Sequence, residues 1–243
     1  MNLILLEADA LSGNGHVILR GARAEHICSV LKKEAGDEIR IGVIDGPTGT
    51  GTIQSSSAGE VALQCKLNSE TPARPAVDLL LALPRPKVMK RLWAQLAALG
   101  VGRIILTNAW KVEKNYFDTH VLDSEFYRPR LIEGLQQAGD TRLPEVSIHK
   151  RFKVLIEDEL DELFPDGARL AADPRAAVPV REALGRDRVL VAVGPEGGWT
   201  DYEVELLKSH GFRSVGVGPR VLRTDTACVA LLAVVHDALP ARG

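Results

Sequence analysis

The sequence has few of the features that mark membrane proteins, disulfide-rich proteins or metalloproteins. Its longest apolar run, residues 227–235, is far shorter than the roughly 20 residues of a membrane-spanning helix. Its beginning, MNLILLEAD, lacks the basic start and the cleavage site of a secretion signal. Cys28, Cys65 and Cys228 are odd in number and far apart, and the histidines show no metal-ligand spacing. We therefore expect a cytoplasmic protein with reduced thiols, no membrane association and no metal.

The sequence also has no large excess of positive or negative charge. The formal net charge is -2, which gives no global attraction to nucleic acid, so an RNA partner would need a local basic surface. Residues 1–70 carry six Lys and Arg against nine Asp and Glu. The chain has 243 residues and 45% hydrophobic content, which is enough to bury one large core or two modest ones.

The N-terminal part predicts a small antiparallel β domain over residues 1–71. Short alternating segments at 37–45, 49–55 and 60–67 are separated by glycine-rich turns, and residues 23–33 have a helical pattern. The glycines of DGPTGTGTI, residues 45–53, are followed by a strand and not by a lysine, which favours a hairpin turn over a phosphate loop. The polar stretch NSETPARPA then forms a linker.

Residues 72–243 alternate between strand and helix patterns. Apolar strands at 76–83, 102–109, 145–149, 168–173, 188–193 and 212–218 are separated by helical stretches, among them 87–100, 123–139 and the acidic 153–164. This alternation predicts an α/β domain with a mostly parallel sheet and helices on both faces. Ligands of such sheets bind beyond the carboxyl ends of the strands. Three loops follow such ends: LTNAWKV (106–112), GPEGG (194–198) and GVGPRVLRTDT (216–226).

The stretch VLVAVGPEGGWTDYEVE, residues 189–205, combines a buried strand, a glycine loop and a helix start. Thr200 and Glu203 have the spacing of a capping box, which predicts that a helix begins there. The glycines of the loop allow close backbone approach. A strand, a glycine loop and a helix N-terminus are the parts of a small-molecule pocket.

A second stretch, VGVGPRVLRTDTACVALLAVVHDAL, is a strand, a Gly-Pro turn, an arginine-containing segment and a helix that is apolar nearly all round. It is a near miss to a dinucleotide fingerprint, because the third glycine is absent and no acidic residue ends a following strand. A nicotinamide site is therefore only weakly supported.

Together, VGPEGGWTDYEVELL and VGVGPRVLRTDTACVALLAVV resemble the SPOUT class of RNA methyltransferases. More closely, the chain resembles the RsmE family, which methylates N3 of a uridine in the decoding region of 16S ribosomal RNA. The resemblance extends to AEHICSVLKKEAGDEIRI, RPKVMKRLWAQLAALGVGRIILTNAWKV and LQQAGDTRLPEV. It implies an RNA-binding, PUA-like β-barrel over 1–71 and a SPOUT methyltransferase domain over 72–243 with a C-terminal trefoil knot that binds S-adenosylmethionine. It also implies a homodimer that acts on ribosomal RNA, in the assembled small subunit.

The resemblance carries specific cofactor residues with it. One wall of the cofactor site would be Gly194, Pro195, Glu196, Gly197 and Gly198, and the other Val217, Gly218, Val221, Leu222 and Thr224, with Leu106 and Thr107 from an earlier strand.

The reaction calls for a fixed cation. Uridine N3 becomes nucleophilic only after it loses its proton, and the resulting negative charge spreads onto the carbonyl oxygens. We therefore assign charge stabilisation to Arg223, with Arg220 as a second candidate. Asp225 is a third catalytic candidate, although it stands where the family motif usually has glutamate, and both Thr224 and Asp225 could instead cap the helix.

RNA contacts are predicted from a cluster of cations: Arg85, Lys87, Lys90, Arg91, Lys111 and Lys114. A solvated helix face explains the same cluster equally well, and the chain lacks the N-terminal arginines frequent in the family. Trp110 is a candidate for stacking on a base, whereas Trp93 lies on an apolar helical stripe and is predicted to be in the core. Three alternatives stay open: a paralogue that methylates another RNA, an RNA-binding copy without catalysis, and a nicotinamide-dependent oxidoreductase.

Overall fold

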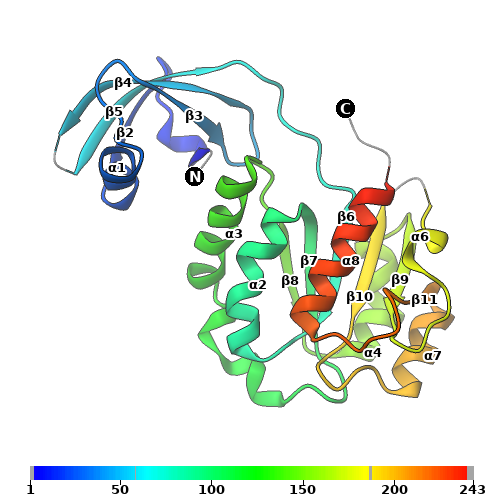
Figure 1. Cartoon of the computed structure of the whole chain (residues 1–243). Coiled ribbons are helices and arrows are strands. Elements are labelled where there is room, and N and C mark those ends of the chain that lie inside the picture. Colours follow the sequence, from blue (N-terminus) through cyan, green and yellow to red (C-terminus); the bar gives the residue numbers. More distant parts are fainter. Residues whose placement is uncertain (1–2, 58, 186–187, 240–243) are drawn as a thin grey trace. The chain divides into compact units, whose positions relative to one another are not determined.

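The computed structural model describes residues 3–57, 59–185 and 188–239 (Figure 1). The chain divides into two compact units. Unit 1 comprises Met1–Ala73 and Ile132–Leu143, and unit 2 comprises Arg74–Leu131 and Pro144–Gly243. Unit 1 therefore takes in a segment from the middle of the chain as well as its N-terminal part.

Unit 1 contains a five-stranded sheet in the order β1-β3-β4-β5-β2. The strands are β1 (Ile4–Leu6), β2 (His16–Arg20), β3 (Glu38–Val43), β4 (Thr48–Ser57) and β5 (Glu60–Leu67). The three predicted strands are confirmed as β3, β4 and β5, and they pair antiparallel. The sequence interpretation missed β1 and β2, and β1 pairs parallel with β3, so the sheet is mixed.

The predicted hairpin is confirmed between β3 and β4. Gly42 pairs with Thr48, and the backbone N–H of Val43 donates to the carbonyl of Pro47 at 2.9 Å. Asp45, in the turn, has a φ of 55°, in the left-handed region that Asp tolerates better than most residues. Gly46 lies in the same turn, and Gly49 and Gly51 lie in β4, so this stretch is not a phosphate loop.

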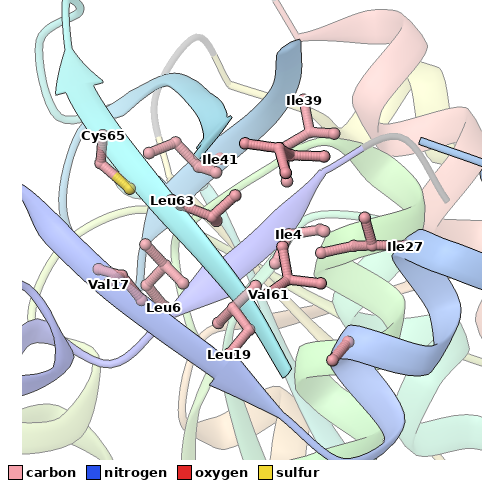
Figure 2. Packing of buried hydrophobic residues seen from close by; sticks show 12 residues of the cluster. Ile4, Leu6, Val17, Leu19, Ile27, Ile39, Ile41, Val61, Leu63 and Cys65 are labelled. Carbon is pink, nitrogen blue, oxygen red and sulfur yellow. The ribbon is translucent and has the colours of Figure 1, made fainter. Parts of the chain in front are cut away.

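The core of unit 1 is formed by side chains of this sheet and of the helical segment that follows β2. The predicted helix is present as α1 (Ala22–Glu25), which continues into a π-helical turn, η2 (His26–Val30). Figure 2 shows Ile27 from this turn packed with side chains from four strands. They include Ile4 and Leu6 of β1, Val17 and Leu19 of β2, Ile39 and Ile41 of β3, and Val61 and Leu63 of β5. In β2 the burial alternates along the strand, so one face packs on the core and the other faces solvent.

Unit 2 contains a six-stranded sheet in the order β11-β9-β10-β6-β7-β8, in which every pairing is parallel. The strands are β6 (Val77–Ala82), β7 (Val101–Thr107), β8 (Glu145–His149), β9 (Ala168–Ala172), β10 (Val189–Val193) and β11 (Phe212–Val215). All residues of β6 and β10 are buried, as expected for central strands. Strand β10 is continuously apolar, whereas β6 includes one buried charged residue, Asp78, which forms an ion pair with Arg188. The predicted α/β class is confirmed.

Helices connect these strands. They are α2 (Pro86–Ala98), α3 (Ser124–Ala138), α4 (Phe152–Val154), α5 (Leu160–Leu163), α6 (Val180–Ala183), α7 (Asp201–Ser209) and α8 (Thr224–Ala238). The acidic helix predicted at 153–164 is present as a continuous helical stretch of α4, η5 (Leu155–Glu159) and α5, in which η5 is π-helical. The short helix α6 was not predicted. Three 3-10 turns, η1 (Ala8–Ala10), η3 (Lys114–Asp118) and η4 (His120–Leu122), complete the described elements.

Helices α2 and α8 lie side by side against the sheet (Figure 1). Helix α2 begins at Pro86, a favoured first helical position, and buries the stripe Met89, Leu92, Trp93 and Leu96. Trp93 is fully buried, and its indole N–H donates to the carbonyl of Val121 at 3.0 Å. The prediction that Trp93 is a core residue is confirmed.

Within the described ranges, no helix is long and apolar enough to cross a membrane. The same residues contain no group of three or more His, Cys, Asp or Glu side chains that could hold a metal ion.

Candidate functional site

The loop after β10 is fixed by the predicted capping box. The Thr200 hydroxyl accepts a hydrogen bond from the Glu203 backbone N–H at 3.3 Å, and the Glu203 carboxylate accepts one from the Thr200 backbone N–H at 2.8 Å. The other oxygen of Glu203 accepts a hydrogen bond from the Trp110 backbone N–H at 2.7 Å. Glu203 is only 3% exposed. One buried carboxylate therefore joins the start of α7 to the loop that follows β7.

Steric requirements explain the glycines of this loop. A Cβ on Gly194 would lie 3.2 Å from the Trp199 indole, and a Cβ on Gly197 would lie 2.7 Å from the Lys111 side chain. Gly198 has a φ of 69°, which side chains other than glycine rarely adopt. The loop is therefore built to lie close to its neighbours with its backbone open to a ligand.

The loop after β11 forms the opposite side. Gly216 is bonded to the segment before α6, because its N–H donates to Val178 O at 3.0 Å and its carbonyl accepts from Val180 N at 3.3 Å. Gly218 has a φ of 122°. Helix α8 then begins after Arg223, whose carbonyl accepts from the Ala227 N–H at 2.7 Å.

A cavity of about 390 Å³ lies between the two loops, at the carboxyl ends of β9, β10 and β11. This volume lies within the range of about 300–1,000 Å³ typical of small-molecule sites. The cavity is lined by Lys111, Ala172, Asp173, Pro174, Arg175, Val193, Gly194, Pro195, Glu196, Gly197, Gly198, Trp199, Val204, Val215, Gly216, Val217, Gly218, Arg220, Val221, Leu222, Thr224, Ala227 and Leu231.

Both sequence motifs meet at this cavity, although Gly198 and Val217 are 19 positions apart in the chain. The predicted cofactor residues that line it are Gly194, Pro195, Glu196, Gly197, Gly198, Val217, Gly218, Val221, Leu222 and Thr224. Leu106 and Thr107 do not line it. They are fully buried at the end of β7, where they pair with Leu81 and Ala82 of β6.

The candidate catalytic residues separate in space. Arg220 and Arg223 are both exposed, but only Arg220 lines the cavity. Asp225 forms an ion pair with Arg91, at 3.0 Å between Oδ2 and Nη2, and its other oxygen accepts from the Thr226 N–H. Arg91, predicted for RNA, and Asp225, predicted for catalysis, are therefore partners of each other. Thr224 is buried at the first turn of α8.

The six cations predicted to contact RNA are all exposed. Two positions of this cluster also hold the cofactor-site loop: the Arg85 backbone N–H donates to Glu196 Oε1 at 3.1 Å, and Lys111 Nζ donates to the Gly197 carbonyl at 2.7 Å. Lys87 and Lys90 lie on the solvent side of α2, and Lys114 begins η3. Of this cluster, Lys111 therefore lines the cavity, and Arg85 contacts Glu196 of its wall.

The sequence interpretation missed the wall that follows β9. Asp173 and Arg175 line the cavity there and are joined by a salt bridge of 3.1 Å. Partial burial by itself would raise the pKa of Asp173, but the hydrogen bonds and charge of Arg175 outweigh it and leave the pKa below its ordinary value. Asp173 is therefore a weak base. Its position directly after a buried parallel strand was the signal that could have identified it.

The lining suits a molecule with apolar and polar parts. Val193, Leu222 and Leu231 supply apolar surface, and the glycine backbones supply hydrogen-bonding groups at close range. The Trp199 indole N–H is buried without a hydrogen-bond partner in the described structure. S-adenosylmethionine, with an adenine ring, a ribose and an amino-acid end, fits this combination of groups.

Comparisons with known proteins agree with this site. Residues 71–236 match the RNA methyltransferase domain family. The chain is 32% identical to the ribosomal RNA small subunit methyltransferase E of Treponema pallidum, over 97% of this chain and 90% of that protein. It is 26% identical to methyltransferase E 1 of Borreliella burgdorferi, over 95% of both chains. The crystal structure of the Neisseria gonorrhoeae enzyme bound to S-adenosyl methionine shares the fold, with a TM-score of 0.78 and 20% identity over 98% of each chain.

The family match covers the whole strand and helix alternation of unit 2, including both loops that enclose the cavity. The chain therefore belongs to the RNA methyltransferase family and, within it, to the ribosomal RNA small subunit methyltransferase E family.

Proposed function

We propose that this protein transfers a methyl group from S-adenosylmethionine to N3 of a uridine in the decoding region of 16S ribosomal RNA. The observation that carries the proposal is the cavity at the carboxyl ends of β9 to β11, whose two walls are the two glycine motifs. The names of the relatives supply the class of RNA, and the resemblance of the motifs to the RsmE family supplies the position on the base.

The cofactor would be held by the glycine loop after β10 and by the loop after β11. Gly194, Gly197 and Gly218 line the cavity without side chains, so their backbones allow close approach of a ligand, although the Gly197 carbonyl already accepts from Lys111 Nζ. Leu222 offers an apolar surface. When bound, S-adenosylmethionine supplies an electrophilic methyl group on a sulfonium. The Trp199 indole lies close to the Gly194 backbone, which fixes the shape of this wall.

A cation at the cavity would favour the deprotonated uridine. Arg220 is placed for this role, because it lines the cavity and a protonated guanidinium stabilises charge on the carbonyl oxygens of the base. Arg223, our first candidate from the sequence, would act at the rim by positioning the base or a phosphate. Asp225 would act indirectly, since Arg91 already holds it.

We propose a trefoil knot at the C-terminus of unit 2. The chain leaves β11 at the edge of the sheet, bonds to residues 178–180 and then packs α8 against β10 and β6 near the centre. This path, beside the segment that joins β9 to α6, is what a knotted SPOUT domain requires. For unit 1, the mixed five-stranded sheet around a single apolar core supports the PUA-like barrel.

We also propose a homodimer that uses α8 and the loop before it. Val221 is 81% exposed. Val229 and Ala233 of α8 are also apolar and exposed. A second copy of this chain would cover such a surface. Sedimentation velocity tests this proposal: Ala233→Glu should give monomers, whereas a variant that sediments like the unsubstituted protein contradicts it.

The RNA would approach over the six exposed cations, of which Lys111 lines the cavity. The substrate would be the assembled small subunit, in the cytoplasm. A different RNA remains the second candidate, because residues 1–70 are more acidic than basic.

The deciding experiment is methyl transfer from labelled S-adenosylmethionine to small ribosomal subunits that lack the modification, followed by mass spectrometry of the nucleosides. N3-methyluridine is the expected product. Label in another nucleoside would overturn the proposed chemistry, and label only in another RNA would overturn the substrate.

Two variants test the role of the arginines. Arg220→Ala should reduce kcat by about 100-fold or more, a loss typical of one charge-stabilising group, with cofactor affinity little changed. Arg223→Ala should raise KM for the subunits more than it lowers kcat. The opposite pattern would return the catalytic role to Arg223.

A further inference from the structure

Trp110 is the most exposed large hydrophobic residue of the described structure. Its side chain is 84% exposed, whereas Trp93 is fully buried and Trp199 is 7% exposed. A tryptophan in a core or an interface removes about 150–250 Å² from water, so an indole left in solvent forgoes most of that stabilisation. An exposed indole in a loop is therefore available to a partner.

The backbone around Trp110 is held firmly. The Trp110 N–H donates to the buried Glu203 carboxylate at 2.7 Å, and the Val112 N–H donates to the Ala109 carbonyl at 3.0 Å. Lys111, the next residue, donates to the Gly197 carbonyl at 2.7 Å. The indole thus projects from a fixed frame, and binding to it costs little ordering of the backbone.

This frame also sets where the indole is. Lys111 lines the cavity, and Glu203 belongs to the helix that follows the glycine loop, so Trp110 lies at the edge of the cofactor site. Exposed cations follow it in the chain at Lys111 and Lys114. An aromatic platform beside cations is the arrangement with which proteins bind unpaired bases of RNA.

We propose that Trp110 stacks on an unpaired base of the RNA substrate and so positions the target uridine at the cavity. This inference rests on the proposed function, because it requires an RNA substrate. It makes Trp110 a residue that binds the substrate, and it assigns no chemical step to the indole.

The test compares Trp110→Ala, Trp110→Leu and Trp110→Phe with the unsubstituted protein on small ribosomal subunits that lack the modification. Co-sedimentation measures binding of the subunits, methyl transfer gives kcat and KM, and calorimetry gives affinity for S-adenosylmethionine. Loss of one base–aromatic stack should weaken subunit binding by about 5- to 150-fold in the Ala variant. The Phe variant should keep most of the binding, the Leu variant should lose it, and cofactor affinity should not change in any of them.

Several results would overturn the inference. They are unchanged subunit binding by Trp110→Ala, rescue by Leu as complete as rescue by Phe, a parallel loss of cofactor affinity, or a change of oligomeric state in sedimentation velocity, which would place the indole in a subunit interface. The binding measurement does not depend on catalysis. If the unsubstituted protein binds subunits without methylating them, the proposed reaction fails while the role of Trp110 is still decided. If it does not bind them, both proposals fail.

Discussion

Replacement of Glu203 by alanine tests whether one buried carboxylate holds the candidate site together. Its two oxygens accept hydrogen bonds from the Thr200 N–H at 2.8 Å, the Thr200 hydroxyl at 2.8 Å and the Trp110 N–H at 2.7 Å. Thr200 remains the N-cap of α7, and loss of the reciprocal hydrogen bond from its backbone N–H to residue 203 costs about 1 kcal/mol. Loss of a charge-assisted hydrogen bond to a backbone N–H costs about 1.5–3 kcal/mol. We therefore expect Glu203→Ala to lower the free energy of unfolding by about 2–4 kcal/mol.

Two further variants make this prediction specific. Glu203→Gln keeps the size but has only one acceptor oxygen, so either the cap of α7 or the Trp110 loop loses its partner, and the cost should be intermediate. Glu205→Ala is the matched control, because Glu205 lies on the same helix with a side chain that is 75% exposed. An exposed substitution of this kind should change stability by about 0.5 kcal/mol or less.

Urea unfolding followed by circular dichroism measures the stabilities, and calorimetry measures the affinity for S-adenosylmethionine. Glu203 holds the start of α7, which follows the glycine loop, and the loop after β7, which carries Lys111 of the cavity wall. Loss of this carboxylate should therefore weaken cofactor binding as well. If Glu203→Ala were no more destabilising than Glu205→Ala, the idea that this carboxylate joins the loops would be wrong.

Three other predictions concern steric fit, thiol reactivity and pH. Gly194→Val should abolish cofactor binding, because its Cβ would press on the indole below, while Gly185→Val, at an open position, should bind normally in the same calorimetry. Burial raises the pKa of the Cys228 thiol to about 12. At pH 8 the native protein should therefore show one thiol that reacts fast with Ellman's reagent, and Cys28→Ser should remove this reaction. Fast reaction of Cys228 would contradict its burial. Burial lowers the pKa of His236, so the unfolded chain binds a proton that the folded chain does not, and stability should fall as pH drops below about 6.5. His236→Gln should flatten this fall between pH 7 and pH 5, and equal slopes in both proteins would count against it.

Much of the fold follows from local sequence. The continuous apolar run of β10 predicts a central parallel strand because a strand covered on both faces has no polar side. The start of α7 could be predicted from Thr200 and Glu203 because a capping box needs only residues three apart. The glycine loop after β10 could also be predicted to border a pocket, because a strand, a glycine loop and a helix N-terminus are the parts of a small-molecule pocket.

The order of the elements, the position of the two glycine loops and the family to which they point all follow from the amino-acid sequence. Which residues meet is known only from the folded chain: Glu203 holds Trp110, Asp225 pairs with Arg91, Asp173 and Arg175 form a third wall, and Arg220 rather than Arg223 lines the cavity. Caps and strand patterns arise from interactions over a few residues, so they can be read from local sequence. Contacts such as Arg91 with Asp225 join residues 134 positions apart, and they depend on how helices pack against the sheet, which no local pattern specifies.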